Sequence, residues 1–298
     1  MNLHTIDTGF FKLDGGAMFG VVPKTIWNKI NTADANNLCT WALRCLLIET
    51  DNRLILVDTG IGNKQDAKFL SHYHLHGETS LDESLKKCGF GGEEITDVFL
   101  THLHFDHCGG AIERKGDQLL PTFPNARYWS NEIHWAWAVN PNDREKASFL
   151  RENIQPIRDA GLLNMVQVDD RATDFSSWSG SEDPSSPPTA IRFSRDFQIR
   201  FVNGHTRMMM LPQLKYKGRT IVFMADLLPS AGHLPLPYVM AYDMFPLTSL
   251  KEKKLFLEEA VAGDYILFFE HDPLYECCTL QKTEKGIRAK EFFTLKEL

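Results

Sequence analysis

The 298-residue sequence contains no long hydrophobic run and no clustered basic run. A membrane helix needs about 18 consecutive apolar residues, so we expect no membrane partner. Nucleic-acid binding normally requires a clustered positive surface, whereas the net charge here is −7. We therefore expect no nucleic-acid partner. The first residues also lack the positive start and apolar core of a signal peptide, which favours a cytoplasmic location.

The sequence also lacks the paired cysteine spacing of a zinc ribbon. The six cysteines are scattered through the chain, as is typical of free thiols in a reducing compartment. Cys108 lies inside a polar motif, but no separate base is spaced to activate it. We interpret it as a small buried filler rather than a nucleophile.

A dense group of metal-binding side chains follows the apolar residues 98–100. His102, His104, Asp106 and His107 lie within six positions. Imidazole and carboxylate are the usual ligands of zinc and related ions. At an extended strand end, side chains two positions apart point the same way, so His102 and His104 can bind one ion. Asp106 and His107 follow at the point where the chain must turn, so they can face a second ion beside the first.

This pattern resembles the His-x-His-x-Asp-His motif of the metallo-β-lactamase superfamily, and all four positions match. The resemblance implies an α/β fold, a four-layer αββα sandwich of two mixed sheets flanked by helices. Residues 1–298 would form one domain. A Ser/Pro-rich stretch near residues 171–190 cannot bury a core, and we interpret it as a surface excursion from that domain.

Three further ligands are predicted in the second half, because three apolar runs there lead into His205, Asp226 and His271. Strand ends share one edge of a layered α/β fold, so these side chains can converge with the motif. The resemblance implies two divalent transition-metal ions, zinc foremost, with iron, manganese or cobalt as alternatives. The implied ligands are His102, His104 and His205 for the first ion, Asp106, His107 and His271 for the second, and Asp226 as the bridge.

The resemblance also assigns chemistry to this site. Two ions can share a hydroxide, whose parent water is acidified to a pKa of about 7, and can polarise a carbonyl or phosphoryl oxygen. The implied reaction is hydrolysis by a metal-bridging hydroxide. Asp106 and Asp226 are the candidate acids for proton transfer to the leaving group, and the sequence does not decide between them. Asp58 resembles the superfamily acid that accepts a hydrogen bond from a ligand imidazole.

Two segments outside the motif, residues 15–23 and 226–230, are similar to the lactonase and organophosphate-hydrolase branch of the superfamily. This similarity favours a small ester-like substrate, such as an N-acyl-homoserine lactone. A thioesterase of the glyoxalase II type is the alternative enzyme. The non-enzymatic alternative is a metal-binding sensor or scaffold that does not turn over a substrate. A small-molecule substrate is the expected partner, and a homodimer remains open.

The predicted substrate pocket contains five residues: Met18, Phe19, Trp27, Phe105 and His233. Two positions depart from the relatives. Arg207 follows the predicted ligand turn where many relatives carry proline, and Pro229 replaces a tyrosine that helps some lactonases hold the substrate carbonyl. His233 is a candidate substitute for that phenol.

Local patterns predict the remaining elements. Residues 1–22 are expected to form short strands joined by a glycine turn. Helices are predicted at residues 80–87, 143–160 and 247–262. A separate histidine-rich stretch is expected to be solvated rather than metal-binding, because residues two apart on a helix diverge. Its members are His72, His74 and His76.

Overall fold

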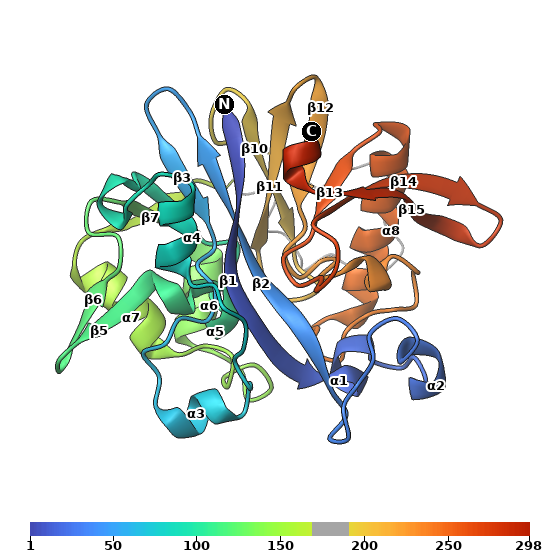
Figure 1. The fold of residues 1–298 in the computed structure, drawn as a ribbon, viewed down its shortest axis with the longest axis horizontal. Helices are drawn as coiled ribbons and strands as arrows, with labels where there is room; N and C mark the ends of the chain where they lie inside the picture. The colour runs from blue at the N-terminus through green and yellow to red at the C-terminus, as the bar shows by residue number, and fades with distance from the viewer. Residues whose placement is uncertain (169–190) are drawn as a thin grey trace.

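The structure is a computed structural model that describes residues 1–168 and 191–298, so the Ser/Pro-rich stretch lies outside the described residues. Two mixed sheets lie face to face (Figure 1). The first contains, in spatial order, β1 (Asn2–Asp14), β2 (Leu38–Glu49), β3 (Leu54–Val57), β4 (Asp97–Phe99), β7 (Arg127–Asn131) and β8 (Leu163–Val166). The second contains β15 (Gly286–Phe293), β14 (Cys277–Thr283), β13 (Ile266–Phe268), β12 (Arg219–Phe223), β11 (Met209–Tyr216), β10 (Phe197–Val202) and β9 (Ile191–Arg192).

Strand direction changes within each sheet. β3, β4, β7 and β8 run parallel to one another, whereas β1, β2 and β3 pair antiparallel. In the second sheet only the β12–β13 pair is parallel among the described strands. Parallel neighbours end at the same edge of their sheet, so the loops that follow β3 and β4 lie together in the first sheet, and those that follow β12 and β13 lie together in the second.

Alternating side chains on β2 explain the layers. Leu46 and Ile48 belong to the apolar cluster between the two sheets, which includes Phe197 of the second sheet. Cys45 and Leu47 point the other way and pack in a second cluster, with helix residues. Because strand side chains alternate between faces, both faces of this sheet are buried.

Helices cover the outer faces of both sheets (Figure 1). Those outside the first sheet include α4 (Leu81–Lys87), α6 (Glu132–Val139) and α7 (Arg151–Asp159), and α8 (Pro246–Ala262) covers the second. Shorter elements are α1 (Gly15–Phe19), α2 (Lys24–Trp27), α3 (Ala67–Ser71), α5 (Phe105–Cys108) and the hairpin β5 (Ile112–Lys115) with β6 (Gln118–Pro121). The predicted four-layer αββα sandwich is confirmed. No helix among the described residues is long and apolar enough to cross a membrane.

Two local predictions were wrong. Residues 1–22 form one long strand and then helix α1, because the Asp14 side chain accepts the N–H of Ala17 and caps the helix. Gly15 is needed there for packing, since a Cβ atom would collide with the Trp27 ring. The helix predicted at residues 143–160 starts only at α7.

The start of that predicted helix is a loop for a definable reason. The Asn142 side-chain oxygen accepts the N–H groups of Arg144 and Glu145, at 2.9 and 3.1 Å. Asparagine side chains that bond nearby backbone in this way compete with helix formation. The resulting loop, residues 141–150, faces the predicted metal site.

Lys253 of α8 gives the fold a testable pH dependence. Its side chain is buried and donates to the carbonyl groups of Pro235 and Tyr238, at 2.7 and 2.9 Å. Burial lowers the pKa of Lys253 to about 7. Between pH 7 and 10 the unfolded chain therefore binds more protons than the folded chain, so stability rises with pH.

Urea unfolding at pH 7.0 and 8.5 tests this effect. The free energy of unfolding should rise more steeply with pH in the wild type than in Lys253→Met, with the difference at most about 1.4 kcal/mol per pH unit. Parallel pH profiles for the two proteins would show that Lys253 is charged in the folded state at neutral pH.

Candidate metal centre

The motif loop between β4 and α5 is held on two sides. The N–H and hydroxyl of Thr101 donate to the carboxylate of Asp58, at 2.8 and 2.6 Å. Leu103 donates its N–H to His134 Nε2 at 2.9 Å. At the end of the motif, Gly109 packs where a Cβ would collide with the backbone of Ile61. These contacts fix the loop before any ligand binds.

All seven predicted ligands are buried, and they converge from the strand ends of both sheets. Among the described residues, their ligand atoms form two groups within 4.8 Å. The groups are His102, His104, His205 and Asp226, and Asp106, His107 and His271. Asp106 and His107 lie on α5, so the second group is presented by a helical turn rather than by the strand end.

The spacing in the first group fits one shared ion. His102 Nε2 and His205 Nε2 each lie 3.1 Å from His104 Nδ1. Nitrogen ligands arranged tetrahedrally around zinc at about 2.05 Å stand roughly 3.3 Å apart. Both separations from His104 Nδ1 are therefore close to the value that a single bound ion would give.

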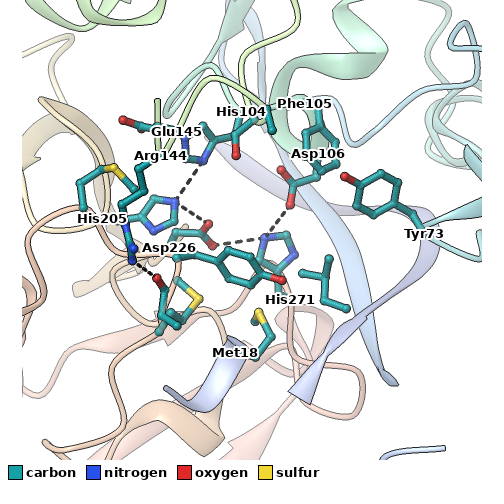
Figure 2. Close-up of a pocket in the computed structure, with 17 residues that line it drawn as sticks. Met18, Tyr73, His104, Phe105, Asp106, Arg144, Glu145, His205, Asp226 and His271 are labelled. Atoms are coloured by element: carbon teal, nitrogen blue, oxygen red, sulfur yellow. Dashed lines mark hydrogen bonds and ion pairs between the residues drawn. The ribbon is translucent and has the colours of Figure 1, made fainter. Parts of the chain in front are cut away.

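Asp226 lies between the two groups (Figure 2). Its Oδ2 atom is 3.0 Å from His205 Nε2 and 3.5 Å from His107 Nε2. Its Oδ1 atom is 3.2 Å from His271 Nε2. One carboxylate thus contacts imidazoles of both groups, as a bridging ligand must.

Acidic side chains fix the tautomers of two imidazoles in the first group. His104 Nε2 lies 2.9 Å from Glu145 Oε1, and His205 Nδ1 lies 2.9 Å from Asp243 Oδ1. An ionised carboxylate only accepts hydrogen bonds, so each imidazole donates from that nitrogen. The other nitrogen is left with a free lone pair facing the centre.

The same logic assigns His107 and His102. His107 Nδ1 lies 3.2 Å from Asp58 Oδ2 and donates to it. His102 Nδ1 lies 3.1 Å from the Thr101 hydroxyl. Because this hydroxyl donates its proton to Asp58, its oxygen accepts the hydrogen bond from His102 Nδ1. Asp58 therefore sits behind the motif, holding one ligand directly and another through Thr101.

His271 completes the set, because its Nδ1 lies 2.8 Å from the carbonyl oxygen of Ala42 and donates to it. Its Nε2 lone pair then faces Asp226 Oδ1, which has no hydrogen-bond donor among the described residues. Two acceptors at 3.2 Å repel unless a proton or cation lies between them. All five imidazoles thus have the tautomer of metal ligands, and the residues fit two ions.

Comparison with known proteins gives the family. The model of the metallo-beta-lactamase superfamily matches residues 44–182, which include the whole motif. The structure of a probable metal-dependent hydrolase from Staphylococcus aureus is 25% identical, with a TM-score of 0.83 over 98% of this chain and 96% of that chain. The chain carries the motif and the fold of the metallo-beta-lactamase superfamily.

Other known proteins match with different coverage. A probable metallo-hydrolase of Mycobacterium bovis is 32% identical over 37% of this chain and 40% of its own length. An N-acyl homoserine lactonase of Bacillus cereus is 33% identical over 27% of this chain and 36% of its own. The chain thus spans well under half the length of these relatives. The structure of AidC, a dizinc quorum-quenching lactonase, is 20% identical, with a TM-score of 0.73 over 98% of this chain and 95% of that chain.

The electrostatics of this superfamily site favour a bound cation. Burial would lower the pKa of His205, but the carboxylates of Asp226 and Asp243 raise it to about 10. Burial and the neighbouring imidazoles hold the pKa of His102 well below its usual range. Without metal, His205 binds a proton beside Asp226, and a metal ion must displace that proton. Metal binding therefore releases protons and weakens at acid pH.

Sequence patterns did not reveal Glu145 and Asp243. Burial would raise the pKa of Glu145, but hydrogen bonds lower it to about 2. Its donors include His104, the Thr206 hydroxyl and Trp137 Nε1, the last at 2.6 Å. Both acids lie on loops outside the superfamily motif, so no spacing rule linked them to the ligands.

A cavity of about 340 Å³ opens over the ligands (Figure 2). Met18 and Phe105 line it, as predicted. Phe19, Trp27 and His233 do not line it, which corrects the predicted pocket. They stack behind the wall, with Phe19 ring centroids 4.7 Å from His233 and 5.5 Å from Trp27.

His233 supports the wall and does not replace the missing phenol. Its Nε2 atom bonds the Met18 carbonyl at 2.9 Å, and its Nδ1 bonds the Ser230 hydroxyl at 2.8 Å. Pro229 has a structural contact of its own, because its carbonyl accepts the N–H of His271 at 3.1 Å. The replacement of tyrosine by Pro229 thus keeps a backbone hydrogen bond to the predicted ligand His271.

The Arg207 side chain lies over the Trp137 ring, with its guanidinium carbon 6.0 Å from the ring centroid, and the Arg207 backbone is held by His134. The His134 ring accepts the Leu103 N–H through Nε2 and donates to the Arg207 carbonyl through Nδ1, at 2.6 Å. Burial lowers the pKa of His134 to about 4, so the ring stays neutral and keeps both roles. His134 therefore joins the motif loop to the turn that carries His205.

The histidine-rich stretch beyond α3 stays apart from the site. His72, His74 and His76 are exposed. His76 stacks on Phe10, with ring centroids 5.6 Å apart. None of the three belongs to a metal-binding group among the described residues.

Proposed function

We propose that this metallo-hydrolase is binuclear and opens lactones, with an N-acyl-homoserine lactone as the favoured substrate. The observation that carries the proposal is Asp226, which contacts imidazoles of both ligand groups beneath a cavity. The sequence similarity to an N-acyl homoserine lactonase supports the choice of substrate.

The chain's own residues divide the remaining work. Two bound divalent ions, zinc foremost, would supply an acidified water and polarise the substrate carbonyl. Asp226 and Asp106 both line the cavity. We assign proton transfer to Asp226, because its carboxylate lies between the two ligand groups in the cavity wall, where it can carry a proton to the leaving alkoxide. Asp106 then remains a ligand of the second group.

The cavity wall suits an acyl chain. Its apolar members include Leu13, Met18, Phe105, Met240 and Met244. Methionine side chains adapt to irregular apolar ligands. A glutathione thioester, the substrate of the alternative glyoxalase II-type enzyme, carries several charges, and among the described lining residues Arg144 is the only lysine or arginine that could pair with its carboxylates.

A substrate panel on protein of measured metal content tests the proposal. N-hexanoyl-homoserine lactone should be hydrolysed with kcat/KM on the order of 10⁴ M⁻¹s⁻¹ or above, and S-lactoylglutathione much more slowly. Faster turnover of the thioester would favour the alternative enzyme. No turnover of lactones, esters, thioesters or phosphotriesters with both ions present would favour a sensor or scaffold. A cytoplasmic location and a homodimer belong to the same proposal, and no step of the chemistry depends on them.

A further inference from the structure

Arg144 is a cation in the wall of the substrate cavity. It lies beside Glu145 and His205, at the end of the cavity that belongs to the first ligand group (Figure 2). Among the described lining residues it is the only lysine or arginine. The opposite end is aromatic, with Tyr73 and Phe105 rings 4.7 Å apart. The cavity therefore has a cation at one end and aromatic rings at the other.

Backbone carbonyl groups hold the guanidinium in place. Nη2 donates to the carbonyl oxygens of Ala241 and Asp243 across the cavity mouth, the second at 3.4 Å. A guanidinium has five N–H groups in a rigid fork. Those on Nε and Nη1 have no hydrogen-bond partner among the described residues, and no carboxylate there forms an ion pair with Arg144. The guanidinium is therefore held in place through Nη2, while its Nε and Nη1 N–H groups can still donate to a ligand.

We propose that Arg144 determines substrate specificity by binding an oxygen acceptor outside the reacting bond, such as an amide carbonyl or a carboxylate on the ring substituent. The proposal rests on the proposed lactonase function and narrows its substrate class to lactones that carry such an oxygen. A fork held in advance loses little entropy on binding, and a charge-assisted hydrogen bond is stronger than a neutral one.

A purely structural role is the competing explanation. Arg144 links the loop that carries Glu145 to the loop that carries Asp243, and these acids orient His104 and His205. If Arg144 served only as this link, its loss would loosen metal binding and affect every substrate alike. Metal content and substrate preference therefore separate the two roles.

The test compares Arg144→Met, Arg144→Lys and the surface control Arg158→Met. Three substrates are used: N-hexanoyl-homoserine lactone, γ-decalactone, which has an alkyl chain and no amide, and a γ-lactone whose side chain ends in a carboxylate. Arg144→Met should raise KM for the amide-bearing lactone about 10- to 100-fold more than for γ-decalactone, with metal content retained. Arg144→Lys should recover part of this preference, and Arg158→Met should not change it.

The outcomes separate this inference from the proposed function. A larger loss for the carboxylate-bearing lactone than for the amide would identify a carboxylate as the selected acceptor. Equal losses on all lactones, or metal loss in Arg144→Met, would overturn the specificity role and leave the lactonase proposal standing. If the wild type hydrolyses none of the three lactones, both proposals fall.

Discussion

Asp226→Ala is expected to lower lactone hydrolysis by roughly 10²- to 10⁴-fold, the range for loss of a general acid, and to reduce the bound metal as well. The reason is its position, since it contacts His205 and His107 through one oxygen and His271 through the other. No other described carboxylate contacts both ligand groups in this way. Its loss therefore removes the bridge and the proposed proton carrier together.

Asp226→Ala should be assayed beside Asp117→Ala, which removes an exposed acid in the β5–β6 turn. Circular dichroism on both variants checks that the fold persists. The control should keep wild-type kcat and metal content. Wild-type turnover by Asp226→Ala would show that the reaction does not pass through the shared carboxylate.

Glu145→Ala is the second substitution with a large expected effect, although Glu145 is not a predicted ligand. It should weaken metal binding about 10- to 100-fold, as is typical when the partner of a ligand imidazole is lost. Without Glu145, the Nε2 proton of His104 has no acceptor, and the tautomer that presents Nδ1 is no longer fixed. The buried donors of Trp137 and Thr206 also lose their acceptor.

Competition with a chromophoric chelator measures this change as a shift in the metal dissociation constant. Glu132→Ala is the matched control, because Glu132 is an exposed acid in the first turn of α6. Activity at saturating metal should recover in Glu145→Ala if the residue acts by positioning His104. An unchanged dissociation constant would show that Glu145 only stabilises the loop.

The sequence identified the residues that the fold brings together at the site because their chemistry is local. Four of them occupy a short motif, and His205, Asp226 and His271 each follow an apolar strand. The sandwich was predicted from the resemblance that the motif carries, and the burial of both faces of β2 agrees with it. Apolar runs identified the strands that lead into the predicted ligands.

The supporting residues could not be predicted in this way. Glu145 and Asp243 reach their histidines from loops, and loop paths depend on contacts such as the Asn142 turn that no periodicity encodes. The same limit explains the pocket. Phe19 and His233 are apolar or aromatic neighbours of Met18, but only packing decided which side chain reaches the cavity.

Metal titration of the chelated protein tests the central claim most directly. Lactone hydrolysis is measured while zinc is added to protein freed of metal, and bound zinc is counted per chain. The two ligand groups predict no hydrolysis at the start and an increase that ends at two bound ions per chain. Full hydrolysis without metal, or binding that saturates below two ions per chain, would contradict the binuclear site.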